Sequence, residues 1–576
     1  MVKNVSDQLV EMLKQAGVKR VYAITGDSLN PVNDAIRRDG NIEWVHVRHE
    51  EAAAYAASMD AELNGIGCCM GSSGPGHVHL VNGLYDANRS GNPVIAIAST
   101  VETDTLGTNG FQETQPTLLF QDCSKYVHMA YTPKQFTKVM QHAIQVAKSE
   151  RGVAVVGLPG DVASAKAEEV ESSDITYMPD SIYRPSDREI TELADILNNH
   201  KDVTLYCGIG AKDAVEQVEA LAEKLKAPIA YSFRGKIFFD KENSPYTVGM
   251  NGLLGNPAGF HACKESEVLV LVGTDFPYTD FFPIDNKIVQ IDLRPNRMGR
   301  RAKVDHAYAG DIKDTLEALL PQIESKEDDS FLKKHKKSFE KDFKKYDIET
   351  SKKSKEDHVS PEAAAHLINK MAADNAIFTV DTGMTSVWAA RLIKAGNGRY
   401  LTGSFNHGSM ANAMPMAIGA AASQPNRQVV AMCGDGGISM LLGDLATIMQ
   451  YNYPIKIIVF NNRSLGMVKL EMEVAGYIDW QTNMVNPPFH KIAELMNMKG
   501  IVIENNSGLE AGLKEAFDHN GPVLVNIFTN PNTLAMPPKV TMDQMKGFAE
   551  SFGKKVLEGK IGDASDMVKA GIDAIV

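Results

Sequence analysis

Two groups of residues in the C-terminal half of the chain could together hold a metal ion and a phosphate. Asp435 lies in the run Cys433-Gly434-Asp435-Gly436-Gly437, and the second group is Asn461-Asn462. A carboxylate and an amide oxygen are ligands that Mg²⁺ accepts alongside phosphate oxygens and water, and glycine amides can face the phosphate. The pair therefore predicts a magnesium–diphosphate site. The alternative interpretation is an ordinary tight turn, since a lone Gly-Asp-Gly is common.

The segments before these two groups explain how they would meet. Residues 428–433 and 455–460 are short apolar runs that predict buried parallel strands, and residues 440–450 predict a helix between them. A right-handed crossover places two such strands side by side, so that their carboxyl ends face one crevice. We therefore expect Asp435 and Asn462 to project into the same space.

A possible acid–base group occurs near the N-terminus. His49-Glu50-Glu51 follows the apolar run at residues 42–47. If Glu50 projects from a strand end into an apolar pocket, its pKa is raised and it can exchange a proton with a bound heterocycle. An exposed acid pair at a helix N-terminus fits the spacing equally well. Gly71-Ser-Ser-Gly-Pro-Gly76 likewise fits either a ligand cradle or a simple turn.

Four further places along the chain carry weaker signals. Phe111-Gln112-Glu113 lies in a loop beyond a predicted strand, where functional side chains are frequent. Gly208-Ile-Gly210 is half of a dinucleotide fingerprint, and Asp292 ends a strand, which suits ribose hydroxyls. A cofactor-free domain of the same fold is the alternative there. Met410 lies before a predicted helix, where a methionine is more often part of the core than a ligand support.

The whole chain alternates helical patterns with short apolar strands, which predicts an α/β protein with three doubly wound parallel-sheet domains. We expect a first domain at 1–180, a central domain at 181–335, a third domain at 336–530 and a tail at 531–576. Residues 172–187 have the polar composition of a linker. The charged stretch at 324–358 is interpreted as a solvated helix and linker.

Composition narrows the class of protein. The 576 residues are 44% hydrophobic and 23% charged, as in ordinary globular proteins. The net charge of −13 argues against a general nucleic-acid binder. Six scattered cysteines without a CxxC spacing favour buried free thiols in a reducing compartment. Because the first residues lack a signal-peptide core and no run reaches about 18 apolar residues, we expect a cytoplasmic protein.

These separate signals together resemble one family. Gly434-Asp435-Gly436 with Asn461-Asn462 resembles the thiamine-diphosphate motif, and Arg48-His49-Glu50-Glu51 resembles the glutamate site of the same enzymes. Residues 18–20, 25–30, 111–114, 403–415 and 429–437 resemble the bacterial pyruvate oxidase family, and most closely its quinone-reducing, peripheral-membrane flavoenzyme branch. The likeness extends over essentially the whole chain. It implies pyrimidine-binding, central FAD-binding and diphosphate-binding domains, in that order.

The resemblance implies roles for specific residues. Asp435, Asn462 and the carbonyl of Ser464 would bind Mg²⁺, Glu50 would contact the aminopyrimidine ring, and Met410 would support the bent cofactor. Thiamine diphosphate would contact Glu50, Gly408, Ser409, Met410, Asp435, Gly436, Gly437, Asn462, Arg463, Ser464, Leu465, Gly466, Met467 and Val468. FAD would contact Asn251, Gly252, Leu253, Leu254, Thr274, Asp275, Phe276, Pro277, Tyr278 and Asp292. The reacting centre would be lined by Glu50, His79, Phe111, Gln112, Met467, Val468 and Glu471.

The implied reaction is oxidative decarboxylation of pyruvate to acetate and CO₂, with electrons passing through FAD to a quinone. A phosphate- and O₂-dependent oxidase that makes acetyl phosphate and H₂O₂ is the first alternative, and acetolactate synthase is the second. Met467 replaces a phenylalanine of the quinone-reducing branch, which removes an aromatic group linked there to electron transfer. The likeness also implies a homotetramer with active sites between subunits.

The tail bears on the electron acceptor. As a helix, residues 564–576 would place Met567, Val568, Ile572, Ile575 and Val576 on one stripe. Such a stripe could lie in the interface of a bilayer, on the inner face of the cell membrane, as in the quinone-reducing branch. A helix docked on its own subunit is the alternative.

Overall fold

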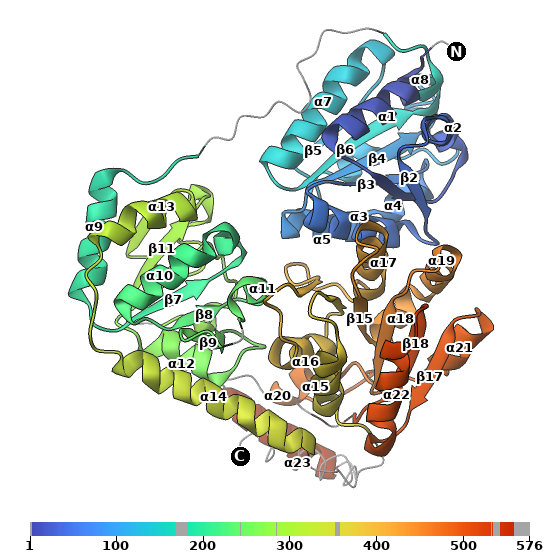
Figure 1. Cartoon of the computed structure of the whole chain (residues 1–576). Coiled ribbons are helices and arrows are strands. Elements are labelled where there is room, and N and C mark those ends of the chain that lie inside the picture. Colours follow the sequence, from blue (N-terminus) through green and yellow to red (C-terminus); the bar gives the residue numbers. More distant parts are fainter. Residues whose placement is uncertain are drawn as a thin grey trace.

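Three six-stranded sheets form the framework of the protein, seen here in a computed structural model (Figure 1). The structure describes residues 3–168, 182–241, 243–283, 285–351, 358–531, 533 and 542–557. Every strand pairing within the three sheets is parallel, with helices on both faces. The predicted fold class, three α/β parallel-sheet units, is confirmed.

The first sheet has the strand order β2-β1-β3-β4-β6-β5. Its strands are β1 (Arg20–Ala23), β2 (Glu43–His46), β3 (Gly67–Gly71), β4 (Val94–Thr100), β5 (Tyr126–Met129) and β6 (Val153–Pro159). Its helices are α1 (Val5–Ala16), α2 (Asn30–Asp39), α3 (Glu50–Asn64), α4 (Pro75–His79), α5 (Val81–Ser90), α6 (Pro116–Leu119), α7 (Pro133–Ser149) and α8 (Gly160–Ser164). Helix α1 begins with a capping box between Asn4 and Asp7, which satisfies amides at its first turn.

The central sheet has the order β12-β11-β10-β7-β8-β9, which is the order of a dinucleotide-binding Rossmann domain. Its strands are β7 (Val203–Cys207), β8 (Ile229–Tyr231), β9 (Thr247–Met250), β10 (Val268–Val272), β11 (Lys287–Asp292) and β12 (His306–Ala309). Its helices are α9 (Asp187–Asn199), α10 (Val215–Leu225), α11 (Lys236–Phe239), α12 (Pro257–Glu265), α13 (Ile312–Leu319) and α14 (Ser330–Ser351).

The third sheet, β14-β13-β15-β16-β18-β17, repeats the connection pattern of the first sheet rather than that of the central one. Its strands are β13 (Ile377–Val380), β14 (Tyr400–Gly403), β15 (Val429–Gly434), β16 (Lys456–Asn461), β17 (Lys499–Ile503) and β18 (Val523–Phe528). The helices are α15 (Pro361–Met371), α16 (Met384–Leu392), α17 (Ala413–Ser423), α18 (Asp435–Met440), α19 (Leu445–Tyr451), α20 (Gly466–Val474), α21 (Phe489–Leu495), α22 (Asn506–Asp518) and α23 (Met542–Leu557).

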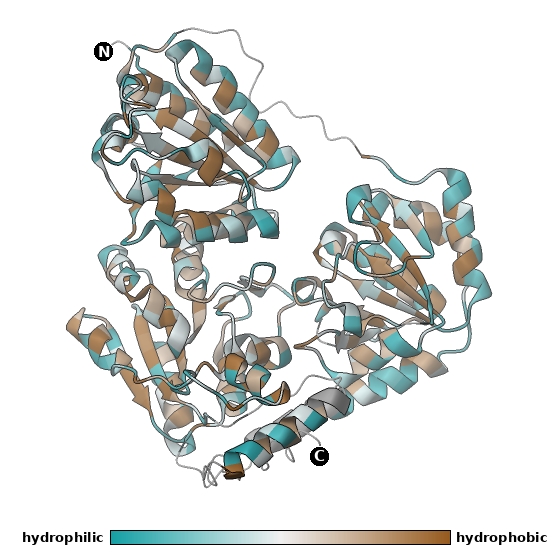
Figure 2. Cartoon of the chain, turned by 180° about the vertical axis from the view of Figure 1, so that it is seen from behind, coloured by the Kyte–Doolittle hydropathy of each residue, from teal (hydrophilic) through white to brown (hydrophobic). Residues whose placement is uncertain are grey.

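Strands buried on both faces explain the continuous apolar runs in the sequence. All residues of β4, β10 and β16 are buried, and in Figure 2 the strands of the central sheet are mostly brown, whereas the outer helices carry much teal. Parallel sheets covered by helices on both sides require such runs. The six cysteines are all buried and free, as their positions in apolar segments predicted.

The first and third domains share one core. Helix α3 packs against α17, and buried side chains of both domains, among them Tyr55, Met59 and Met414, belong to a single hydrophobic cluster. Small residues permit the close approach, since a Cβ on Gly419 would lie 2.3 Å from the backbone oxygen of Ala56. Figure 1 shows these two helices between the first and third sheets. The α3–α17 contact therefore fixes how the two domains are placed in one chain.

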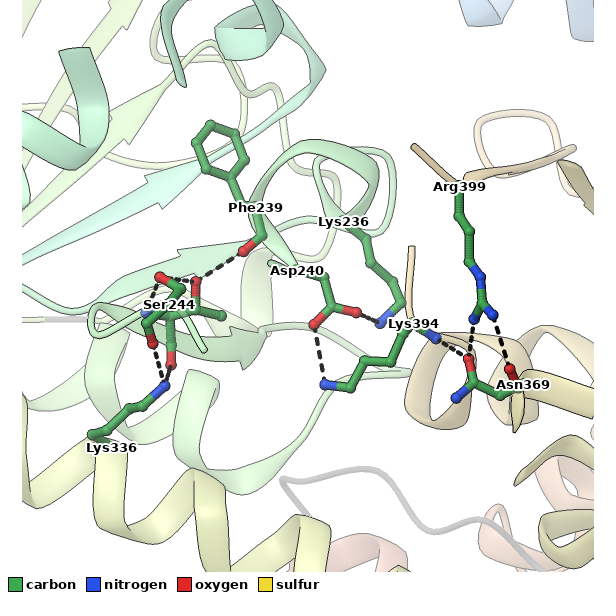
Figure 3. Close-up of polar contacts among 9 residues, drawn as sticks. Lys236, Phe239, Asp240, Ser244, Lys336, Asn369, Lys394 and Arg399 are labelled. Carbon is green, nitrogen blue, oxygen red and sulfur yellow. Dashed lines mark hydrogen bonds and ion pairs between the residues drawn. The ribbon is translucent and has the colours of Figure 1, made fainter. Parts of the chain in front are cut away.

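The central and third domains meet at a buried ion cluster (Figure 3). Asp240 is 3% exposed, and its carboxylate lies 2.6 Å from the ammonium of Lys236 and 3.5 Å from that of Lys394. Burial alone would raise the pKa of Asp240, but the two ammonium groups lower it to about 2. Asp240 is therefore ionised and links the end of α11 in the central domain to Lys394, two residues after α16.

The structure differs from the sequence expectations at the helix of 440–450 and at residue 335. The segment expected to be one helix at 440–450 is divided between the last residue of α18, a short 3₁₀ turn at Leu442–Asp444, and α19; α18 itself begins at Asp435. The helix begins earlier because Gly436 and Gly437 pack without side chains: a Cβ on Gly437 would lie 2.0 Å from a carboxylate oxygen of Asp381. Helix α14 spans residue 335, where a domain boundary was expected, and it packs on α12.

Most of the expected linker at 172–187 and the amphipathic stripe at 564–576 lie outside the described residues. Within the part of the chain that is described, no helix has the length and apolar character that crossing a membrane requires.

Candidate functional site

Asp435 is held in place by three hydrogen bonds at the carboxyl end of β15. Its side chain is 3% exposed. The Oδ1 atom accepts from the Gly436 amide at 2.9 Å, and Oδ2 accepts from the Arg463 amide and the Asn486 side chain, each at 2.7 Å. Burial raises the pKa of this carboxyl group to about 6, although the three donors act in the opposite direction. A cation beside it would offset that cost of burial.

Asn462 and Ser464 lie on the turn after β16. Asn462 is half-buried, and its Oδ1 atom accepts from the Ser464 amide at 3.0 Å. Arg463 between them has a φ of 55°, which turns the chain back toward α20. The buried hydroxyl of Ser464 has no hydrogen-bond partner among the residues described, so it is free to contact a ligand. This orphaned hydroxyl shows that the turn fits a polar group.

A cavity of about 280 Å³ opens in front of these residues. Of the residues predicted to bind thiamine diphosphate, it is lined by Gly408, Met410, Asp435, Gly436, Gly437, Asn462, Ser464, Leu465, Gly466, Met467 and Val468, and Glu471 joins them. Ser409 and Arg463 are adjacent in sequence but do not line it. Met410 packs against Gly436, where a Cβ would lie 2.9 Å from the methionine Cε. A side chain at position 436 would therefore collide with Met410.

The cavity lies at a topological switch point. Strands β13 and β15 are neighbours in the sheet. The strand that follows β13 (β14) lies on one side of this pair and the strand that follows β15 (β16) lies on the other. Asp435 directly follows β15. Ligands of open α/β sheets bind in the crevice at such a point. Asp381, which follows β13, is 1% exposed and accepts from the amide of Gly434 at 3.2 Å. Its buried carboxyl group thereby fixes the turn that carries Asp435.

Glu50 is the first residue of α3, and His49 is its N-cap. The position matches the helix N-terminus that the sequence allowed, but the side chain is buried rather than exposed, at 6%. His79, at the end of α4, places Nδ1 2.9 Å from Glu50 Oε2, and its ring stacks on that of His49 with centroids 4.5 Å apart. The two histidines thus orient the carboxyl group.

The loop that carries Phe111 and Gln112 has a constrained backbone. Gln112 has a φ of 61°, and its carbonyl accepts from the Ser73 hydroxyl at 2.9 Å. The ring of Phe111 is 88% exposed. In the described part of the chain, neither residue lines the cavity, and neither do Glu50 and His79. A single chain therefore does not bring the expected pyrimidine-side residues to the cavity that the expected diphosphate residues line.

The residues expected to contact FAD gather at the switch point of the central sheet. At this point β7 and β10 are neighbours, and the crossovers that follow them lead to opposite sides of the sheet. Thr274 comes after β10, and Asp292 ends the neighbouring β11. Asp292 is 8% exposed, burial raises the pKa of its carboxyl group, and Oδ1 accepts from the Arg294 amide. The remaining expected contacts are Asn251, Gly252, Leu253 and Leu254 after β9, and Asp275, Phe276, Pro277 and Tyr278 after Thr274.

Glycines pack the start of this crevice tightly. A Cβ on Gly208 or Gly210 would lie 2.5 or 2.8 Å from the carbonyl oxygen of Gly273. A Cβ on Gly252 would lie 2.7 Å from the ring of Phe276. Gly208 and Gly210, predicted as half of a fingerprint, therefore serve the packing of the turn after β7 against the turn after β10. The strand order and the buried acid of the central domain fit an adenine dinucleotide.

Asn486 is a site residue that the sequence analysis missed. Its side-chain amide bonds both Asp435 Oδ2 and, at 2.9 Å, Asn461 Oδ1. It lies in an irregular segment, Met484-Val-Asn-Pro-Pro488, with no motif spacing to mark it. Its only sequence signal is a polar residue before two prolines, which is too common to be informative.

Comparison with known families gives three matches along the chain. The profiles for thiamine pyrophosphate enzymes match as the N-terminal TPP binding domain at residues 3–118, the central domain at 190–319 and the C-terminal TPP binding domain at 381–527. Each match falls on one of the three sheets, and the C-terminal match contains both Asp435 and Asn462.

Whole-chain relatives have different printed functions. A Bacillus subtilis (strain 168) protein, YdaP, whose name describes it as thiamine pyrophosphate-containing, is 34% identical over 97% of both chains. Pyruvate oxidase of Lactiplantibacillus plantarum is 31% identical, over 90% of this chain and 87% of its own. The acetolactate synthase large subunit of Pyropia yezoensis is 28% identical, over 94% and 95%.

Proposed function

Because the chain belongs to the thiamine pyrophosphate enzyme family, we propose that this thiamine pyrophosphate-dependent enzyme is a pyruvate oxidase that converts pyruvate to acetate and CO₂ and passes the electrons through FAD to a quinone. The observation that carries the proposal is the cavity at the end of β15, where a buried carboxylate, an amide oxygen and an orphaned hydroxyl converge. The L. plantarum pyruvate oxidase and the Phe111-Gln112-Glu113 loop support the oxidase over the synthase.

Different residues of the cavity would contact the metal ion, the diphosphate and the apolar part of the cofactor. Asp435, Asn462 and the carbonyl of Ser464 would hold Mg²⁺, and Gly436 and Gly437 line the cavity where the diphosphate would lie. Met410 and Leu465 supply apolar surface beside Gly436. When bound, thiamine diphosphate supplies an electron sink for the bond that breaks as CO₂ leaves, and FAD supplies a two-electron acceptor.

Glu50 and His79 provide the acid–base part of the site. A buried carboxyl group next to an imidazole can pass a proton to or from a ring nitrogen of the aminopyrimidine. Met467, Val468 and Glu471 of α20 also line the cavity, and pyruvate would bind beside them. Asp292 holds ribose hydroxyls of the dinucleotide, and residues 251–254 and 274–278 surround its other parts.

The proposed enzyme is an oligomer with its active sites between subunits, in a homotetramer. Two observations support this. The described lining of the cavity comes entirely from the third domain, and Glu50 belongs to the first. Phe111 at 88% exposure and Val468 at 45% are exposed apolar side chains that a second chain would cover. Contact with the inner face of the cell membrane through the tail remains part of the proposal.

Turnover assays test the proposal. The purified enzyme with Mg²⁺, thiamine diphosphate and FAD is given pyruvate and, in separate reactions, a quinone analogue, ferricyanide, or O₂ with and without phosphate. We expect acetate formation coupled to quinone reduction, without peroxide. Phosphate-dependent peroxide and acetyl phosphate would instead establish the O₂-dependent oxidase. Acetolactate as the main product, with no acceptor reduced, would overturn the proposal in favour of the synthase.

A further inference from the structure

Helix α23 buries a lysine at a position where a surface helix buries an apolar residue. Lys555 is 1% exposed, while Leu557, two positions later, is 88% exposed. The Lys555 ammonium lies 2.5 Å from Glu473 and 2.8 Å from Asp479. Burial lowers the pKa of Lys555, but hydrogen bonds to these two carboxylates raise it more, so the lysine stays charged. Removing one partner of such a buried cluster leaves an uncompensated charge.

The backbones of α23 and α20 touch beside this cluster. A Cβ on Gly547 would lie 2.2 Å from the carbonyl oxygen of Val474, the last residue of α20. The Ser551 hydroxyl donates to the Tyr477 carbonyl at 2.8 Å, and Lys554 donates to the Gly476 carbonyl at 2.6 Å. Figure 1 shows α23 beside α20 at the outer side of the third domain. Steric fit and charge therefore fix the same end of α20.

The segment after α20 connects this contact to the metal-binding carboxylate. Asp479, paired with Lys555, accepts from the Thr482 hydroxyl at 3.3 Å. The Thr482 carbonyl in turn accepts from the amide of Leu465, a cavity residue, at 2.8 Å. Asn486, at the end of the same segment, donates to Asp435. Residues 475–486 thus run from α23 to the two sides of the cavity.

We propose that Lys555 is a positioning residue for the diphosphate site, which holds residues 475–486 in the path that brings Asn486 onto Asp435. The inference rests on the proposed function only in taking the cavity as the thiamine diphosphate site. It assigns to α23 a role that none of the matched family regions includes, since the C-terminal match ends at residue 527. Lys555 contacts no lining residue of the cavity among those described, so its effect passes through the 475–486 segment.

Two independent changes on α23 test the proposal. Lys555→Met removes the charge, and Gly547→Ala inserts a methyl group between the two helices without changing charge. Lys546→Met is the matched control, because Lys546 is 76% exposed on the same helix. Two quantities are measured. The first is the rate of amide hydrogen exchange of residues 475–486 in the cofactor-free protein. The second is the Mg²⁺ concentration at which half of the protein has bound thiamine diphosphate. We expect both test variants to exchange faster in this segment and to need about tenfold more Mg²⁺, with the control unchanged.

A double substitution separates positioning from general stabilisation. If Lys555 acts through Asn486, Lys555→Met combined with Asn486→Ala needs no more Mg²⁺ than Asn486→Ala alone, whereas independent effects would add. Once saturated with cofactor, the Lys555→Met enzyme keeps a pyruvate KM within about twofold of the wild type. Additive effects, or wild-type exchange and Mg²⁺ requirement in both α23 variants, would overturn the inference. If the wild-type protein binds no thiamine diphosphate, the proposed function itself is wrong, and this outcome is distinct from failure of the inference about Lys555.

Discussion

The side-chain amide of Asn486 lies 2.7 Å from Asp435 Oδ2 and 2.9 Å from Asn461 Oδ1, so one residue ties together the ends of β15 and β16. These are the two strand ends whose polar residues form the expected metal site. The Arg463 amide binds the same Oδ2 atom from the other side. The carboxylate is therefore oriented before any cation arrives, and this orientation depends on a residue distant in sequence from both strands.

Replacing Asn486 should weaken the metal site without emptying it. In Asn486→Ala, Asp435 keeps its backbone donors but loses the group that fixes its rotamer, and partners of metal ligands typically contribute about 10- to 100-fold in affinity. We expect the Mg²⁺ needed for thiamine diphosphate binding to rise by that factor, measured by titration calorimetry. Asn483→Ala, an exposed position in the same segment, is the control. Unchanged binding in Asn486→Ala would show that Asp435 needs no such support.

Glu50→Gln should greatly slow turnover and leave the fold intact. Glutamine can still bond His79 but cannot give or take a proton at that position, and a positioned acid or base typically contributes about 10²- to 10⁴-fold to rate. The kcat for pyruvate should fall by that factor while thiamine diphosphate still binds. Glu51→Gln, at the neighbouring position, serves as the control, because the Glu51 carboxylate accepts a hydrogen bond from Asn82 rather than from His79. Near wild-type turnover in Glu50→Gln would exclude Glu50 from the chemistry.

Local pattern was sufficient to predict that Asp435 and Asn462 face one cavity. Asp435 and Asn462 each directly follow an apolar strand, and adjacent parallel strands bring their ends together whatever the rest of the chain does. Glu50 was predicted only as one of two alternatives, because burial of its side chain depends on α4 and His79, which a strand pattern does not reveal.

The parts that could not be predicted depend on contacts between distant segments. Asn486 reaches Asp435 along an irregular path that α23 supports, and no periodicity marks such a path. The early start of α18 follows from Gly437 packing on Asp381, a contact across two strands. The strand order of the central sheet, which distinguishes it from the other two, follows from which side each crossover takes, and the apolar runs do not encode this directly.

The two lysines around Asp240 should differ in their contribution to stability. Lys236 is 2% exposed and supplies the short contact, so Lys236→Met leaves a buried carboxylate with one distant cation and should cost about 3–5 kcal/mol. Lys394 is 37% exposed and lies farther away, so solvent screens it and Lys394→Met should cost about 1 kcal/mol or less. Urea unfolding of both variants at neutral pH measures the difference. Equal losses would show that the cluster acts as one unit.

Asp86 should make stability depend on pH near neutrality. Burial raises the pKa of this carboxyl group to about 7, although the Ser404 hydroxyl donates to Oδ1, and Oδ2 has no hydrogen-bond partner in the described residues. Since the folded protein holds a proton that the unfolded chain releases near pH 4, the contribution of Asp86 to stability falls as pH rises from about 4 to 7 and is level above. The whole window corresponds to at most about 4 kcal/mol.

Asp86→Asn isolates this contribution, because asparagine keeps an acceptor for Ser404 and cannot ionise. We expect the variant to match the wild type in urea unfolding at pH 4.5 and to exceed it at pH 7.5. Asp122→Asn, at an exposed position, should follow the wild type at both values. A wild type whose stability advantage over Asp86→Asn grew with pH would mean that Asp86 is ionised in the folded protein, stabilised by a cation at its open oxygen.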